Sequence, residues 1–124
     1  MSKLYFTTEW VVRPVTPDTL RHVLHVAGRL NCLLYQHGSS RNDAGFFVVP
    51  FVIRVPSRTA LDQFIHEAGA RMGLTEWTPA TAEDFHGAPF MGSRIGGFVE
   101  ASAVYGRANT LLRQREDDDQ PAQK

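Results

Sequence analysis

The fold of this 124-residue chain depends first on one segment, FFVVPFVIRV, at residues 46–55. Its apolar run is nearly continuous, which is typical of a β-strand that is buried on both faces. Pro50 lies within the run, and because proline has no backbone N–H, the strand needs a bulge, an edge or a break there. The segment therefore predicts a buried strand with one local irregularity.

The sequence before this segment predicts a strand and a long helix. Residues 5–12 are rich in aromatic, β-branched and threonine side chains and stop just before a proline, so they predict the first strand. Thr16, Pro17 and Asp18 follow as a helix cap, an N1 proline and a first-turn acid. Apolar residues then recur at helical spacing, which predicts a helix that continues to Leu34.

The sequence after the segment predicts two more helices. Ser57 is placed to cap a helix that stops at Gly73, and apolar residues at helical spacing predict a last helix from about Phe98 to Arg115. Shorter elements complete the chain: a polar loop at residues 37–45, a short strand at residues 74–78, a helical turn at residues 79–85, and a strand or extended loop at residues 88–95.

This order, β-α-β-α-β-(α)-β-α, predicts one compact α+β domain over residues 1–115. We expect a small mixed or antiparallel sheet packed by two to three helices. Residues 116–124 contain no apolar residue apart from one alanine and are strongly charged, so they predict a disordered tail.

Composition excludes several classes of protein. The single cysteine excludes a disulfide scaffold, and the formal net charge of zero argues against a generic binder of nucleic acid. The longest apolar run is too short to cross a bilayer, and no signal peptide is recognisable, so we expect no membrane partner and a cytoplasmic location.

The neutral charge is a cancellation between blocks of the sequence. Residues 1–58 carry +4, residues 59–100 carry −4, residues 101–115 carry +3, and the segment from Glu116 carries −3. Blocks along the chain become surface patches only if the fold keeps them apart.

The best candidate for a ligand site is the glycine-rich segment that precedes the last predicted helix. Glycines allow a ligand to approach the backbone, a helix N-terminus offers free N–H groups, and an arginine can bind an anion. The segment matches neither the Walker nor the dinucleotide pattern, and its glycines could equally serve a turn or close packing. The candidate residues are Gly92, Ser93, Arg94, Gly96 and Gly97, with Arg107 and Arg113 downstream on the helix.

Metal and catalytic patterns are absent from the sequence. His22 and His25 have helical spacing but no third ligand nearby, and no zinc, P-loop or nucleophile motif occurs. We therefore assign no metal, no cofactor and no catalytic residue. Cys32 falls in an apolar stretch and is expected to be a buried, inert thiol. A small enzyme that uses His37 or His86 as an acid or base remains a third hypothesis.

Aromatic residues suggest a surface for partners. If helices cover only one face of the sheet, the other face would expose an apolar patch of the kind that marks an interface. The interface candidates are Phe46, Phe47, Phe51 and Tyr105. The leading hypothesis is accordingly a small non-enzymatic binding protein, an adaptor or inhibitor that acts on another protein or associates with itself. The alternative is a protein that binds a nucleotide or phosphate metabolite through Gly92–Gly97 and the nearby arginines.

Overall fold

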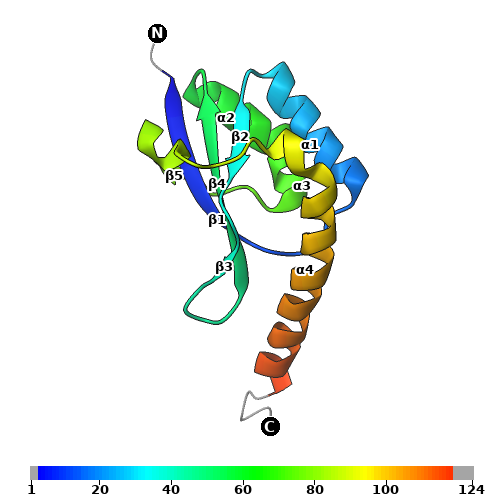
Figure 1. The fold of residues 1–124 in the computed structure, drawn as a ribbon. Helices are drawn as coiled ribbons and strands as arrows, with labels where there is room; N and C mark the ends of the chain where they lie inside the picture. Colours follow the sequence, from blue (N-terminus) through cyan, green and yellow to red (C-terminus); the bar gives the residue numbers. More distant parts are fainter. Residues whose placement is uncertain (1–2, 119–124) are drawn as a thin grey trace.

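The computed structural model describes residues 3–118 and contains one antiparallel sheet packed with three helices (Figure 1). The strands are β1 (Leu4–Val11), β2 (Leu33–Gln36), β3 (Ser40–Arg41), β4 (Phe47–Val55) and β5 (Thr78–Pro79). The helices are α1 (Pro17–Arg29), α2 (Arg58–Phe64), which continues through a π-helical turn (Ile65–Gly69) into α3 (Ala70–Met72), and α4 (Ile95–Asp118). Two 3₁₀ turns, η2 (Ala82–Phe85) and η3 (Met91–Arg94), precede α4. The predicted α+β class is confirmed.

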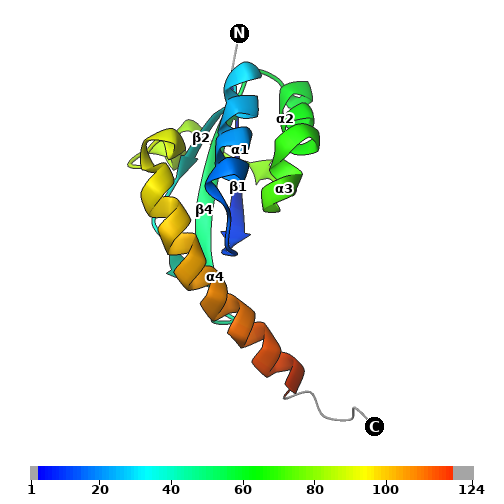
Figure 2. The ribbon, with the colours of Figure 1, turned by 90° about the vertical axis from the view of Figure 1, so that its right-hand side faces the viewer.

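The sheet has the strand order β2-β4-β1-β5, and β3 also pairs with β4. Side chains that share one face of the sheet, among them Phe6, Trp10 and Phe51, belong to the main core together with residues of all three helical bodies. The helices therefore pack on the same face, and α1 lies beside the α2–α3 body (Figure 2). The last turns of α4 extend beyond the sheet in both views (Figures 1 and 2).

The central strand β4 is buried on both faces, as its sequence predicts. On the face turned away from the helices, Val48 and Val52 are fully buried. Phe85 of η2 packs across this face, with its ring 5.1 Å from each of the rings of Tyr5 and Tyr35. A small aromatic cluster thus covers part of the second face, which the helices leave open.

Pro50 is accommodated without interrupting β4. The strand runs unbroken from Phe47 to Val55. The backbone N–H and C=O groups of its odd-numbered residues point toward β1, because Val12 N–H donates to the Phe47 carbonyl. The backbone of Pro50 therefore points to the other side of β4, where β2 and β3 pair. Pro50 lies between the end of β2 and the start of β3. His37 N–H donates to the Pro50 carbonyl at 2.9 Å, so this position is paired on one side only, and the predicted irregularity is the return hydrogen bond that proline cannot donate.

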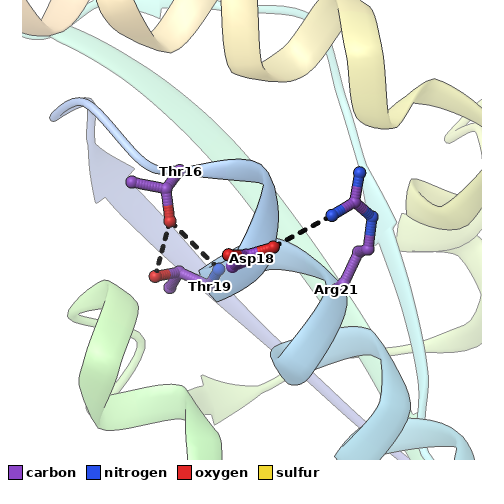
Figure 3. Close-up of polar contacts among 4 residues, drawn as sticks. All are labelled: Thr16, Asp18, Thr19 and Arg21. Carbon is purple, nitrogen blue, oxygen red and sulfur yellow. Dashed lines mark hydrogen bonds and ion pairs between the residues drawn. The ribbon is translucent and has the colours of Figure 1, made fainter.

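The start of α1 confirms the predicted cap. Thr16 is extended, and its Oγ1 accepts a hydrogen bond of 3.1 Å from the Thr19 N–H (Figure 3). Asp18 pairs with Arg21 one turn later, with 3.0 Å between the oxygen and nitrogen. The cap satisfies one of the free N–H groups of the first turn, which fixes where the helix begins.

The end of α1 differs from the prediction. The helix stops at Arg29 and not at Leu34, because Asn31 adopts a left-handed conformation with φ of 58°. Asparagine tolerates this geometry better than most residues, and the chain turns directly into β2. Cys32 therefore lies just before a strand and not on a helix, although it is buried as expected. The predicted loop at residues 37–45 also contains the short strand β3.

The second half of the chain differs from the prediction in its boundaries. The short strand predicted at residues 74–78 is β5 at Thr78–Pro79, whereas the helical turn predicted at residues 79–85 is present as η2. The expected strand or extended loop at residues 88–95 contains only an isolated bridge at Phe90, followed by η3. The last helix begins at Ile95 instead of Phe98 and extends to Asp118. The remainder of the predicted tail lies outside the described residues.

Candidate ligand pocket

A pocket lies between the sheet and the first half of α4. Its volume is about 680 Å³, which is within the range of sites for small molecules. One wall is formed by β1 and β4, the other by η3 and α4, and the β2–β3 connection closes one side.

The position of α4 against the sheet creates this pocket. Asn109 is buried and makes three hydrogen bonds: its Nδ2 donates to Val12 O and Phe47 O at 2.8 and 3.0 Å, and its Oδ1 accepts from Phe47 N–H at 2.9 Å. At Gly106 the helix passes so close to the chain after β1 that an added Cβ would lie 2.5 Å from Pro14 Cδ. These contacts hold the second half of α4 on the sheet, and the first half forms the wall of the pocket.

Aromatic and aliphatic side chains form the apolar part of the pocket. Trp10 and Phe98 stack with ring centroids 5.5 Å apart, and Trp10 Nε1–H donates to the carbonyl of Met72, which fixes the indole ring. Val49 and Tyr105 complete the apolar lining. A flat or branched apolar ligand would find a preformed surface here.

Polar groups lie at the rim of the pocket. Arg94 is exposed at the end of η3, and among the described residues it forms no ion pair. Ser93 and Gly97 lie near it in the sequence, and Gln36 and His37 at the end of β2 also line the pocket. None of the described lining residues is acidic, and Arg94 is the only lysine or arginine among them. Among the described lining residues, Arg94 therefore supplies a positive charge and no side chain supplies a negative one.

His37 is held by a backbone contact. Its Nε2 lies 2.7 Å from the carbonyl oxygen of Asp84, and because a carbonyl only accepts, this nitrogen carries the proton. In the neutral ring Nδ1 is then the acceptor. His86, the other histidine of the third hypothesis, is exposed and does not line the pocket.

The structure brings together only part of the predicted ligand site. Ser93, Arg94 and Gly97 line the pocket, whereas Gly92 and Gly96 do not. Gly92 has a packing role, because an added Cβ would lie 2.6 Å from the ring of Phe90.

The two downstream arginines lie away from the pocket. Arg107 is exposed on α4, and Arg113 lies over the ring of Phe46, with its Cζ 5.7 Å from the centroid. Arg113 also lines a separate, smaller recess beside β1. The arginines therefore do not converge with Arg94 on one anion site.

The aromatic residues proposed for an interface have different environments. Phe51 is fully buried in the core, so in this fold it does not contribute to a surface. Phe47 is half-buried and stacks on Tyr105, with ring centroids 4.5 Å apart. Phe46 is half-buried beneath Arg113. These residues do not form one exposed patch.

Sequence reasoning missed the apolar half of the pocket. Trp10 and Val49 are far from the glycine segment in sequence, and only the pairing of β1 with β4 beneath α4 brings them to it. Nothing in their local patterns distinguishes them from other core residues. Apolar residues at helical spacing predicted a helix from about Phe98. They did not predict which part of the protein this helix would cover.

Nothing in the described residues indicates a metal centre or an activated thiol. No group of three or more His, Cys, Asp or Glu side chains is placed to hold a metal ion there. Burial raises the pKa of the Cys32 thiol to about 11, which suppresses the reactive thiolate. Across residues 3–118, no helix has the length and apolar character needed to cross a bilayer.

No family model, no curated protein and no solved structure matches this chain. The function of the chain must therefore be inferred from the chemistry of the pocket.

Proposed function

We propose that this protein binds a small molecule that carries one negative group on an apolar body, in the pocket between the sheet and α4. The observation that carries the proposal is the position of Arg94 at the mouth of an apolar cavity with no acidic residue among its described lining. A guanidinium group binds carboxylate or phosphate oxygens through paired hydrogen bonds, and the apolar walls would exclude water from the rest of the ligand.

A single charged group on the ligand, such as one carboxylate or one terminal phosphate, fits the site better than several. Arg94 is the only described arginine or lysine at the pocket, and Arg107 and Arg113 lie elsewhere on α4. A nucleoside diphosphate or triphosphate would leave most of its charge without a partner. The sequence-based alternative is a nucleotide or a phosphate metabolite; of these we retain a small phosphate monoester, and we add a monocarboxylate.

The shape of the apolar lining favours an aromatic body. Trp10, Phe98 and Tyr105 offer ring faces and edges, and aromatic groups gain about 0.5–1.5 kcal/mol from such contacts beyond the burial of their area. Phenyl or indolyl acids are simple probes with this chemistry.

The decisive experiment measures binding of matched acids and amides. Calorimetry and thermal denaturation are run with phenylacetate, indole-3-acetate and phenyl phosphate, and with phenylacetamide as the uncharged counterpart. We expect the anions to raise the melting temperature and the amide to have little effect. Arg94→Ala should weaken binding of the anions at least tenfold, whereas Arg113→Ala, the same substitution at an exposed arginine of α4 outside the pocket, should not.

A second variant tests the location of the apolar body. Ala101 lines the pocket from α4, so Ala101→Leu would fill part of the cavity and weaken binding without removing a charge. If no anion binds at millimolar concentration, or if Arg94→Ala binds as well as the parent chain, the proposal is wrong.

Protein–protein binding is a second candidate. Phe51, one of the residues proposed for an interface, is in the core, but Val104 and Leu111 on α4 are 66% and 58% exposed. An adaptor or inhibitor role would place the partner on this helix and not on the sheet. Pull-down from the host with the parent chain and with Val104→Asp would test it, since a genuine partner should be lost with the variant.

A further inference from the structure

The outer face of α4 carries an exposed stripe of four residues: Glu100, Val104, Arg107 and Leu111. Their spacing of four, three and four places them along one side of the helix. Val104 and Leu111 are more exposed than any other large apolar side chain of the described chain. All four residues are exposed, so this side of α4 is open to solvent in the described structure.

The stripe is not needed for the fold of one molecule. The opposite face of α4 supplies Phe98, Ser102 and Asn109, which are buried against the sheet and the start of α1. Two large apolar side chains that pack on nothing lose the hydrophobic stabilisation that burial would give. Because both side chains lie on one side of one helix, a single partner helix could cover them together.

We propose that the stripe is the docking surface for a second copy of this chain, with the two α4 helices antiparallel and the two-fold axis at Val104. A two-fold interface places the same surface on both sides, so each contact occurs twice. None of the four stripe residues lines the ligand pocket, so the charge pairing proposed here does not depend on the ligand; Gly97, at the edge of both surfaces, is the one residue they share.

The charges of the stripe favour this arrangement. Glu100 and Arg107 lie on opposite sides of Val104, so an antiparallel partner brings its Arg107 to the level of Glu100, within about 2 Å along the helix axis. Two such opposite-charge pairs form. A parallel pair in the same register would instead place Arg107 beside Arg107 and Glu100 beside Glu100. The charges thus distinguish the antiparallel dimer from the parallel one.

The shape of the helix surface agrees with the charges. Leu111 and Gly97 are both seven residues from Val104, so Leu111 of one copy lies level with Gly97 of the other, about 10 Å from the axis of symmetry. Gly97 is exposed, and an added Cβ there would meet no atom within 4 Å. This open position accommodates the leucine of the second copy, and small residues allow helices to approach closely.

The interface is small, so the dimer is expected to be reversible. One helix face buries an area at the low end of specific interfaces, which corresponds to a dissociation constant that is roughly micromolar or weaker. Sedimentation equilibrium of the full chain over a range of concentrations measures this constant directly.

Charge reversal tests the proposed pairing. Glu100→Arg and Arg107→Glu should each weaken dimerisation at least tenfold, and the double variant E100R/R107E should restore it, because both pairs are then opposite again. Arg113→Glu, a matched reversal on another side of α4, should leave the dissociation constant unchanged. A monomer at about 1 mM, or a double variant no better than either single one, would overturn the proposal.

Cysteine cross-linking tests the direction of the helices. In the antiparallel dimer Val104→Cys places two thiols at the axis, whereas Leu111→Cys places them about 21 Å apart along the helices, beyond the reach of a disulfide. With glutathione disulfide as oxidant, the first variant should form a covalent dimer and the second should not. Cys32 does not interfere, because it is buried. Equal cross-linking of both variants would contradict the antiparallel arrangement.

Discussion

Asn109 is the side chain that joins α4 to the sheet. It is 3% exposed, and its amide group bridges the main chains of β1 and β4 through three hydrogen bonds. An amide can donate and accept at once, which allows it to satisfy both carbonyl and N–H groups at the end of the sheet.

Replacement of Asn109 should be strongly destabilising. Asn109→Leu has a similar size but removes all three hydrogen bonds and leaves buried backbone groups unpaired, so we expect a loss of about 2–3 kcal/mol in the free energy of unfolding. Urea denaturation of the variant and the parent chain measures this difference in the free energy of unfolding. The control is Thr110→Ala, at the exposed neighbouring position, which should change the free energy by less than about 1 kcal/mol.

Glu67 should make the stability depend on pH. The hydrogen bond from Gln63, at 2.8 Å, and the contact with Arg29 lower the pKa of the Glu67 carboxyl below its ordinary value of 4.5. A lowered folded-state pKa contributes stability that is present above the unfolded-state pKa and is lost as the pH falls through the folded-state pKa.

The Glu67→Gln variant measures this contribution. We expect it to be less stable than the parent chain at pH 7, and we expect the difference to shrink as the pH is lowered through the acid range. Glu76→Gln, at an exposed position, serves as the control. A difference that stays constant from pH 7 to pH 3 would show that the effect of Glu67 is not electrostatic.

At the scale of elements, two helical glycines should respond in opposite ways to the same substitution. Gly28 of α1 has no atom within 4 Å of an added Cβ, so Gly28→Ala should stabilise the protein by about 0.5–1 kcal/mol through helix propensity. Gly106 of α4 would bring its Cβ to 2.5 Å from Pro14 Cδ and 2.6 Å from Pro14 N. Gly106→Ala should therefore destabilise the protein by about 1–3 kcal/mol.

Thermal and urea denaturation of both variants tests this contrast. Because the two substitutions are chemically identical, any difference between them comes from the surroundings of each glycine. If Gly106→Ala were as stable as Gly28→Ala, the close approach of α4 to the chain after β1 would be wrong.

Local sequence patterns predicted the long elements better than the short ones. The cap at Thr16 and the apolar run of β4 act over neighbouring residues, so the start of α1 and the whole of β4 could be read directly. The end of α1 could not, because Leu30 and Leu34 fit both a helix stripe and a strand alternation. The left-handed turn at Asn31 decides between them.

The two-residue strands β3 and β5 carry too little sequence to form a pattern. β5 exists because Ala80 N–H reaches the carbonyl of Tyr5 and Thr78 lies opposite Thr7, and both contacts are long-range. Their positions follow from the fold around them. The sequence therefore predicted the turn-rich region around β5, but it placed the strand at residues 74–78 and not at Thr78–Pro79.

At the scale of the whole molecule, the site is a product of long-range packing. The glycine segment and Arg94 could be singled out because glycines before a helix and an arginine have a recognisable chemistry. Trp10 and Val49 carry no such signal. The sequence also does not indicate that Arg107 and Arg113 lie away from Arg94. The same packing decides whether the charged blocks of the sequence become charged patches on the surface. The arginines of α4 do not form one patch, because they lie on different sides of the helix.

Cys32 should report on opening of the whole molecule. It is the single cysteine, it is 1% exposed, and burial raises the pKa of its thiol to about 11. At pH 8 only about one thiol in a thousand is then ionised in the native state, so reaction with a disulfide reagent should require unfolding around β2.

The rate of this reaction can be compared with stability. We expect Cys32 to react slowly in buffer, to react fast in denaturing urea, and to react faster in Asn109→Leu than in the parent chain, in proportion to its loss of stability. Fast labelling of the native parent chain would contradict the buried position of the thiol.

The anchoring of α4 also determines how wide the pocket can open. Ser102 receives a hydrogen bond of 3.2 Å from Val15 N–H, and together with Asn109 it holds the middle of the helix on the body of the protein. Ile95 begins the helix about 10 Å before Ser102. Between these two points Phe98 is buried and stacks on Trp10, so the first turn of α4 is held as well, and we expect the mouth of the pocket to keep the same width with and without a ligand.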